Sequence, residues 1–444
     1  MLVSFSVSNY LSFDETVTLS MEKTLTKQHK DHLIDDKYLS GCVLYGANAS
    51  GKTNLLQALW TLSNIVNQQG NIDNFNIVFN KFAFTNEQVS TFIVVYIINN
   101  KKYEYSVSVS QDEVINEELS LINSKDKKNN IFARNNATLS KLGKMISSEK
   151  WYKQRTFPKN ILYLSKLRDD GIEDIPELYG KEHFLNSYNF FENIEFITGM
   201  PKIKSDAFYM IPKINEFKSF LTELLHFADT GIDNVELEPI SDFERSPRFI
   251  NIAIKDNSAI LTKKMNDFYF LVSENGKREV KKLITFHNGK RFILEQESSG
   301  TVKLIELAAV LYYYESYNKD ICLMIDEFDS SLHPILVKQL LIKLLKVNEC
   351  NKSQILTTLH DVLLLDIKDI WRADEVWFVE KDHDQSSQIY SLADFNPQSN
   401  KSVDKDYLVG KYGAIPFIEA ERFWKMQLND KNEKRTNIDG ENST

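Results

Sequence analysis

Alternating apolar and polar positions open the chain. Val3, Phe5 and Val7 are separated by polar residues, and the same alternation returns at Val17 and Leu19. A period of two residues is typical of strands that bury one face. We therefore expect two half-buried strands before residue 20.

The period changes within the stretch "GCVLYGANASGKTNLLQAL", residues 41–59. It begins with a short apolar run that ends at a glycine, which is typical of a buried strand. After Gly51 the apolar residues recur at helical spacing, as Leu55, Leu56, Leu59 and Leu62. The pattern predicts a strand, a tight turn and a helix in immediate succession.

The middle of the chain changes character several times. Residues 92–98 and 103–109 predict two strands joined by the turn "NNKK". Residues 120–160 are polar and rich in lysine, so we expect loops with one short helix there. Residues 178–230 carry a mainly helical pattern, and strand patterns return over 248–294.

The last third of the chain alternates between helix and strand patterns. The predicted helices cover 301–316, 333–346 and 361–367, and the predicted strands cover 321–325, 354–358 and 375–380. Alternation at this spacing indicates βαβ units and a parallel sheet. The polar residues 429–444 lack apolar anchors, and we expect them to form a disordered tail.

The composition of the chain limits the classes of protein to which it can belong. The chain has 444 residues, of which 42% are hydrophobic and 26% charged, so we expect an ordinary globular protein of two or three domains. No apolar run approaches the roughly 20 residues of a membrane helix, and no signal peptide is recognisable, so we expect a cytoplasmic protein without a membrane partner. The three cysteines lie far apart and form no C-x-x-C pair, which argues against a disulfide framework or a zinc site.

The net charge of −9 argues against broad nonspecific binding of nucleic acid. The stretch Lys277–Arg291 nevertheless holds six basic residues. These residues are either the solvated faces of two strands or a local basic surface, so nucleic acid stays open as a partner.

The turn after the first buried strand fits the pattern G-x-x-x-x-G-K-[ST]. Its residues are Gly46, Ala47, Asn48, Ala49, Ser50, Gly51, Lys52 and Thr53. Glycines permit a turn whose backbone N–H groups converge on a phosphate, and the following helix directs its positive end to the same point. We expect Lys52 to reach the β- and γ-phosphates of ATP and the Thr53 hydroxyl to bind Mg²⁺.

A second candidate site lies in "ICLMIDEFDSSLHP", residues 321–334. Five apolar residues predict a buried strand, and acids follow at its carboxyl end, where open α/β sheets bind ligands. Asp326 suits contact with Mg²⁺, and Glu327 could polarise an attacking water. Thr53 and Asp326 are 273 residues apart, so the nucleotide fold must be split by a large insertion.

Two further elements allow two interpretations each. Ser298, Ser299 and Gly300 stand at the start of a predicted helix, either as a simple cap or as a second anion site for a nucleotide held by another subunit. His360 follows a predicted strand, either as an ordinary polar residue or as a group that contacts the γ-phosphate or orients water.

The order of these four elements resembles the ATPase heads of the ABC and SMC type. The resemblance implies an α/β fold: a split P-loop head with a mixed β lobe, a parallel sheet flanked by helices and a mostly helical insertion. It implies Walker A roles for Lys52 and Thr53, a Walker B role for Asp326, and catalytic roles for Glu327 as base and His360 as switch histidine. Ser299 and Gly300 then match the signature motif, which acts in trans across a dimer.

The two ends of the chain resemble a narrower group of proteins. The opening residues, the phosphate loop, "EFDSSLHP" and the late "YLVGKYGAIPFI" are similar to the AAA-type ATP-binding proteins of bacterial abortive-infection systems, the group of the RloA, AbiLi and PARIS ATPases. This similarity implies an ATPase that dimerises on ATP and acts as sensor or scaffold in phage defence. Its implied partner is an effector, Toprim-like or another nuclease, encoded nearby.

We therefore expect residues 1–120 and 245–428 to form the head, and residues 120–245 to form a mostly helical insertion that recognises a partner or trigger. Two alternatives stay open. A DNA-repair or chromosome-maintenance ATPase would carry long coiled-coil arms, for which the insertion is short. An ATP-held scaffold with incidental hydrolysis would have the same motifs.

Overall fold

A computed structural model describes most of the chain. The described residues are 1–67, 72, 81–144, 146–154, 157–197, 215–239, 251–255, 258–263, 267–274, 277–316, 320–347, 352–398 and 402–416. The predicted disordered tail, 429–444, lies outside them. Within this part of the chain, no helix is long and apolar enough to cross a membrane.

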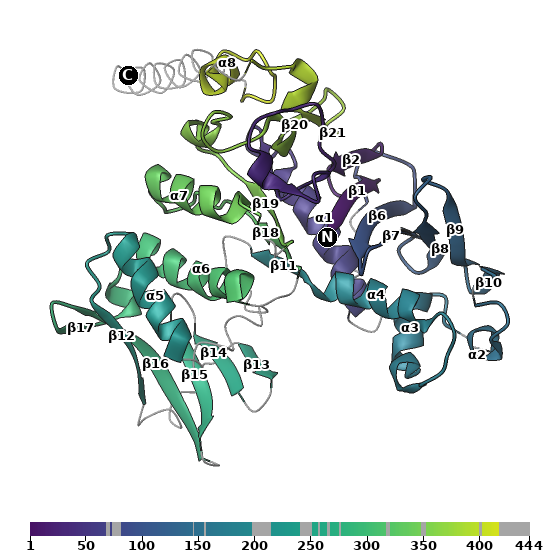
Figure 1. Ribbon diagram of the computed structural model, residues 1–444, viewed down its shortest axis with the longest axis horizontal. Coiled ribbons are helices and arrows are strands. Elements are labelled where there is room, and N and C mark those ends of the chain that lie inside the picture. Colours follow the sequence, from purple (N-terminus) through teal and green to yellow (C-terminus); the bar gives the residue numbers. More distant parts are fainter. Residues whose placement is uncertain are drawn as a thin grey trace, which may run out of the picture.

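A six-stranded sheet forms the centre of the molecule (Figure 1). Its strand order is β11-β18-β19-β5-β20-β21, with bounds Ile194–Ile197, Cys322–Ile325, Gln354–Thr358, Gly41–Tyr45, Val376–Lys381 and Ser387–Ser391. All neighbours are parallel except the antiparallel pair β20 and β21. The parallel sheet predicted from the alternating pattern is confirmed, and it joins strands from both halves of the chain.

Each parallel strand contributes to two hydrophobic cores, because successive side chains point to opposite faces of a sheet. In β5, Cys42 and Leu44 belong to one core, while Val43 and Tyr45 belong to the other. All five residues of β5 are buried. A strand covered on both faces needs apolar residues at every position, which explains the continuous apolar run in the sequence.

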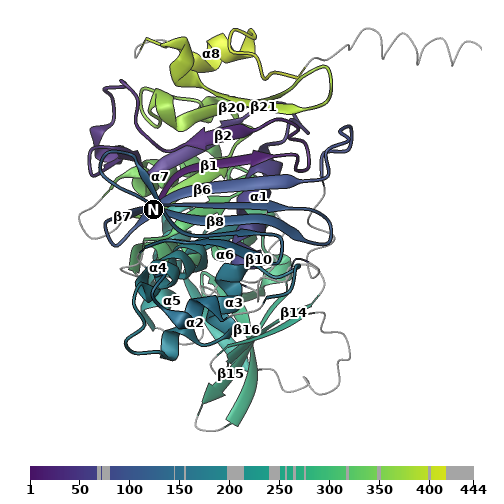
Figure 2. The same cartoon turned by 90° about the vertical axis from the view of Figure 1, so that its right-hand side faces the viewer.

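A seven-stranded antiparallel sheet covers one side of the central sheet. Its order is β10-β9-β8-β7-β6-β1-β2, with bounds Thr138–Leu142, Lys128–Asn135, Val114–Ile122, Lys101–Val109, Ser90–Ile98, Leu2–Ser8 and Val17–Ser20. Figure 2 shows β2, β1, β6 and β8 one below another. The predicted hairpin between β6 and β7 is confirmed: Asn99 and Asn100 both have positive φ, as a tight two-residue turn requires.

Helix α1 (Lys52–Asn67) packs in the core between these two sheets. Its buried face includes the leucines at helical spacing, Leu55, Leu56, Leu59 and Leu62. Helices α3 (Tyr163–Asp169) and α4 (Lys181–Glu192) pack against α1 in the same core. The phosphate loop therefore connects a strand and a helix that are both held rigidly by the core.

Residues 120–160 differ from their predicted loop structure. The predicted boundary at residue 120 lies inside β8, and β9 and β10 extend the antiparallel sheet of the head to residue 142. Among the described residues of this range, only α2 (Lys150–Lys153) is helical. The polar sequence was misleading because β10 lies at the sheet edge, where most of its residues are partly or fully exposed.

The other face of the central sheet is covered by α6 (Ser299–Ser316) and α7 (Pro334–Leu345), with α5 (Asn215–Phe227) packed on α6. The helices predicted over 301–316 and 333–346 are confirmed as α6 and α7. The helix predicted over 361–367 is wrong, because the structure has only a 3-10 turn at Val362–Leu364. Its leucines follow no helical stripe: Leu364 and Leu365 enter the core while Leu363 is exposed.

A third sheet extends away from α5 and α6 (Figure 1). Its order is β12-β16-β15-β14-β13, with β17 beside β16, and the bounds are Asn234–Pro239, Lys277–His287, Asp267–Glu274, Ser258–Lys263, Asn251–Lys255 and Lys290–Ile293. The strands predicted over 248–294 are thus confirmed for the described residues of that range, and residues 248–250 lie outside them. The short strands β3 (Leu33–Ile34) and β4 (Tyr38–Leu39) pair with each other, and α8 (Val403–Leu408) lies near the end of the described chain.

Candidate functional site

The phosphate loop leaves no room for side chains at its two glycines. A Cβ on Gly46 would lie 2.2 Å from the carbonyl oxygen of Val379, and one on Gly51 would lie 2.5 Å from Ser387 Oγ. Gly51 also has a φ of +113°, which side-chain-bearing residues rarely adopt. The loop is therefore clamped against β20 and β21, elements that the sequence places more than 300 residues away.

Lys52 is buried at the first turn of α1, and its Nζ donates to the carbonyls of Gly46 (2.8 Å) and Ala47 (3.1 Å). Burial lowers the pKa of the Lys52 ammonium, while the nearby carboxylates of Asp326 and Glu327 oppose that shift. The ammonium is thus held over the loop and facing the acids that follow β18. This is the position from which a lysine could contact phosphate oxygens.

Thr53 and Asp326 are in direct contact. The Thr53 hydroxyl donates to Asp326 Oδ2 at 2.9 Å and to Oδ1 at 3.1 Å. A hydroxyl beside a carboxylate is the donor set that P-loop enzymes use for Mg²⁺. The structure therefore brings together the two residues that the sequence pattern proposed as Mg²⁺ ligands.

Thr358, at the end of β19, was not singled out by the sequence analysis. Its hydroxyl donates to Asp326 Oδ1 at 2.6 Å and accepts from the backbone N–H of Glu327 at 2.7 Å. Strand β19 lies between β5 and β18. Thr358 therefore stands between the phosphate loop, which follows β5, and the acids, which follow β18. The only indication in the sequence was its position two residues before His360.

Glu327 and His360 approach each other at the mouth of the site. His360 Nε2 lies 3.7 Å from Glu327 Oε1, and both side chains are substantially exposed. Asp329 fixes the turn that carries the histidine, because its Oδ2 accepts from the backbone N–H groups of His360 and Asp361 at 2.7 Å each. Glu327 has a φ of +51°, a costly conformation for a non-glycine residue and one that clusters at functional sites.

These side chains line a cavity of about 590 Å³. Its walls are Asn48 of the phosphate loop and Glu327, Asp329, Ser330, His360 and Asp361. Ala49 continues the loop with a φ of +63°. Ser50 Oγ is buried and has no hydrogen-bond partner among the described residues, and an unpaired buried hydroxyl in a phosphate loop is consistent with a ligand that supplies the partner.

Ser298, Ser299 and Gly300, the turn that matches the signature motif, lie outside this cavity. Ser298 caps α6, since its Oγ accepts from the backbone N–H of Thr301 at 3.1 Å. Ser299 is exposed, and a Cβ on Gly300 would lie 2.6 Å from the carbonyl oxygen of Ser331. The structure therefore separates Ser299 and Gly300 from the cavity of their own chain and places them beside the loop that follows the acids.

Helix α6 brings two charged residues toward the same acids: Lys303, which is buried, and Glu306, which is partly buried. Burial lowers the pKa of Lys303, while the negative charges of Glu306, Glu327 and Asp326 oppose that shift. Burial raises the pKa of Glu306 to about 7, and Lys303 moderates this effect. The sequence analysis assigned no role to either residue, because both look like ordinary surface positions of a helix.

A comparison with protein families matches residues 42–366 to the family described as "AAA domain, putative AbiEii toxin, Type IV TA system". The match spans the phosphate loop, the acids and His360. The chain belongs to this family. It accordingly contains an AAA domain, built here on a split P-loop α/β fold.

Solved structures to which this chain is similar include the SMC head domain from Thermotoga maritima, with 11% identity and a TM-score of 0.38 over 88% of this chain and 98% of that chain. They also include the SMC head bound to the C-winged helix domain of ScpA, with 12% identity and a TM-score of 0.41 over 88% and 97%. The recombination mediator protein RecF has 11% identity and a TM-score of 0.36 over 88% and 98%. No curated protein matches this chain.

Proposed function

We propose that this protein binds ATP with Mg²⁺ and hydrolyses it at the cavity between the phosphate loop and the acids of β18. The observation that carries the proposal is the contact of Thr53 with Asp326, reinforced by Thr358. Residues Asn48 to Thr53 would hold the phosphates, with Lys52 as the cation. Thr53 and Asp326 would hold Mg²⁺, which neutralises phosphate charge when it is bound.

In this proposal Glu327 is the base that orients a water for in-line attack on the γ-phosphorus. Its carboxylate lines the cavity. Lys52 donates to carbonyls of the loop and Thr53 donates to Asp326, so neither side chain occupies Glu327. His360 stands within 3.7 Å and would contact the γ-phosphate or the same water. Catalysis would rest mainly on positioning and charge neutralisation, as in other phosphoryl-transfer enzymes.

We further propose that two copies assemble on ATP. Ser299 and Gly300 form the exposed start of α6, where backbone N–H groups at a helix N-terminus suit an anion. They lie outside the cavity of their own chain, so they would complete the site of a second copy. The contact between Gly300 and Ser331 would couple this turn to the loop after the acids.

The experiment that tests both proposals uses Glu327→Gln. This variant should bind ATP but hydrolyse it at least about 100-fold more slowly, since it lacks the general base. Light scattering after size exclusion should then give a dimer with ATP and Mg²⁺ and a smaller species without them. Glu177→Gln, at an exposed position, is the control and should behave as wild type. Hydrolysis by Glu327→Gln at the wild-type rate would refute the assignment of the base.

We propose a role in bacterial anti-phage defence, with the ATPase acting as sensor or scaffold that controls an effector, such as a Toprim-like nuclease. The family description, which names a toxin–antitoxin system, supports this role, as does the resemblance of both chain ends to RloA, AbiLi and the PARIS ATPase. Expression together with the adjacent gene should reduce phage plating, and Lys52→Ala should abolish the protection. Equal plating with and without the pair across a diverse phage panel would argue against it.

The two alternatives make different predictions. A chromosome-maintenance ATPase would need long coiled-coil arms, and the longest helix among the described residues, α6, has 18 residues. A scaffold with incidental hydrolysis would keep its protective activity in Glu327→Gln. The head at 1–120 and 245–428 and the partner-recognising insertion at 120–245 also stay proposals, with the strands of 120–142 now part of the head sheet.

A further inference from the structure

A second cluster of polar side chains lies away from the nucleotide site, where the chain enters β3. His29, Asp31 and His32 come from one short segment that includes the 3-10 turn Lys30–His32. Each offers one ligand atom, and these atoms lie within 4.8 Å of one another. His32 is buried, His29 is partly buried and Asp31 is exposed, so the cluster is open to solvent on one side.

Both imidazoles are anchored through one ring nitrogen. His29 Nε2 lies 3.2 Å from the carbonyl oxygen of Ile367, and a carbonyl can only accept, so this nitrogen carries the hydrogen. His32 Nδ1 lies 3.1 Å from a carboxylate oxygen of Glu375, which fixes its hydrogen in the same way. The lone pairs are therefore left on His29 Nδ1 and His32 Nε2. This arrangement, with an oxygen acceptor behind each histidine, is the one that orients metal-binding imidazoles.

The two rings lie close together. The ring centroids of His29 and His32 are 4.9 Å apart, and the rings are stacked, with planes that differ by 20°. An ion binds in the plane of an imidazole ring, so a shared ion requires both rings to turn about their side-chain bonds. Two nitrogens bound to one tetrahedral zinc lie about 3.4 Å apart, given Zn–N bonds of about 2.0 to 2.1 Å. Because the ligand atoms already lie within 4.8 Å of one another, rotations that move them by about 1 Å would bring them to that distance.

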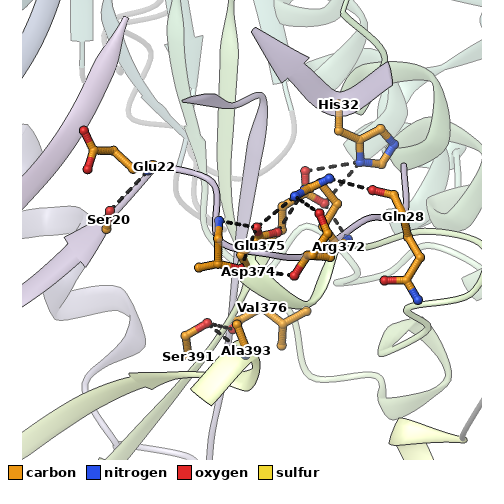
Figure 3. A network of polar contacts seen from close by, with 12 residues as sticks. Ser20, Glu22, Gln28, His32, Arg372, Asp374, Glu375, Val376, Ser391 and Ala393 are labelled. Carbon is orange, nitrogen blue, oxygen red and sulfur yellow. Dashed lines mark hydrogen bonds and ion pairs between the residues drawn. The ribbon is translucent and has the colours of Figure 1, made fainter. Parts of the chain in front are cut away.

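The charged residues next to His32 would accommodate a further positive charge. The guanidinium of Arg372 is engaged by Asp374, at 2.9 Å, and by the carbonyls of Gln28 and Thr26. Glu375 is fully buried, and its carboxylate contacts the His32 ring and accepts from the backbone N–H of Arg372 (Figure 3). A buried carboxylate is costly unless a positive charge compensates it. A dication on His32 would supply that charge through the ring.

We propose that His29, Asp31 and His32 bind a divalent transition-metal ion of the Zn²⁺ class, while Glu375 and the Ile367 carbonyl hold the two imidazoles through their other ring nitrogens. Two imidazoles and one carboxylate favour zinc over Mg²⁺ or Ca²⁺, which prefer oxygen ligands. The site uses no cysteine, so the cysteine pattern of the sequence did not predict it. The ion would clamp the segment before β3 to residues 367–375 of the C-terminal half.

The proposal is independent of ATP hydrolysis, because none of its residues lines the nucleotide cavity.

The test is a titration of the metal-free, full-length protein with Co²⁺, without nucleotide and with excess Mg²⁺ to occupy oxygen-rich sites. We expect one equivalent to bind with a tetrahedral visible spectrum, and Zn²⁺ to displace it. His29→Ala and Asp31→Asn should each weaken binding at least about tenfold, and Glu375→Gln should weaken it about 10- to 100-fold. His226→Ala, at an exposed histidine of α5, should bind as wild type.

A second readout separates a bound ion from a merely structural role of these residues. Zn²⁺ should raise the melting temperature of the wild type, since it binds the folded state, and should leave that of His29→Ala unchanged. Absence of stoichiometric Co²⁺ binding by the wild type would overturn the proposal. Equal Co²⁺ affinity of the wild type and His29→Ala would overturn it as well.

Discussion

The hydroxyl of Thr53 donates to the carboxylate of Asp326 at 2.9 Å across 273 residues of sequence. Strand β5 leads into the loop before Thr53, and β18 ends just before Asp326. Strand β19 lies between β5 and β18 in the central sheet and so joins the two. The nucleotide site therefore exists only when both halves of the chain have folded together. This dependence makes the site sensitive to any change that loosens the pairing of β5, β19 and β18.

Lys52→Ala should weaken ATP binding by about 100-fold or more, because it removes charge-assisted hydrogen bonds worth about 1.5 to 3 kcal/mol each. Isothermal titration calorimetry of the full chain measures this directly. Lys218→Ala, at an exposed lysine of α5, is the matched control and should bind ATP as wild type. Unchanged affinity in Lys52→Ala would refute the assignment of the phosphate loop.

Ser299→Arg should lower ATPase activity at least about tenfold while each monomer still binds ATP, because the turn would act on the nucleotide of a second copy. Calorimetry and a steady-state ATPase assay separate the two properties. Ser124→Arg places the same large cation at an exposed turn and should leave both unchanged. Loss of ATP binding by the Ser299→Arg monomer would mean that the turn works within its own chain.

Thr358→Val should reduce both stability and turnover. It removes the donor to Asp326 and leaves the N–H of Glu327 without its acceptor, at a cost of about 1 to 3 kcal/mol. Thr357→Val is the matched control: this neighbour is also buried, but its hydroxyl donates to the Ile325 carbonyl at 2.8 Å. Urea unfolding should show a loss for both variants, and the ATPase assay should show a loss of kcat only for Thr358→Val.

Glu306→Gln should change how stability depends on pH. Burial raises the pKa of Glu306 from 4.5 to about 7, so between these values the folded state binds more protons than the unfolded state. Stability contributed by this group therefore falls as pH rises through that window, and the loss is complete above pH 7.

The Gln variant has no charge to lose, so it should be more stable than wild type at pH 8, by about 1 to 2 kcal/mol, with little difference at pH 4.5. Urea unfolding at both pH values checks this. Glu223→Gln, at an exposed position of α5, should match the wild type at both. A lower stability of Glu306→Gln at pH 8 would indicate that Glu306 is held charged by Lys303.

Local sequence patterns predicted the strands and helices that have the same environment along the whole of each face. A strand buried on both faces, such as β5, is apolar throughout, and a helix with one buried face, such as α1, shows its leucine stripe. The pattern failed at β10, where partial exposure at the sheet edge permits polar residues. It also failed over 361–367, where consecutive leucines form a short 3-10 turn and not a helix.

The sequence by itself determined the identities and chain order of Lys52, Thr53, Asp326, Glu327 and His360, because a phosphate loop and an acid-ended strand are local patterns. Tertiary structure decided what they contact. The contacts of Thr358 with Asp326, of Asp329 with the turn of His360, and of His32 with Glu375 join segments 31 to 343 residues apart. Hydrogen bonds of this kind depend on which strands become neighbours, and that pairing is decided by burial of the whole core.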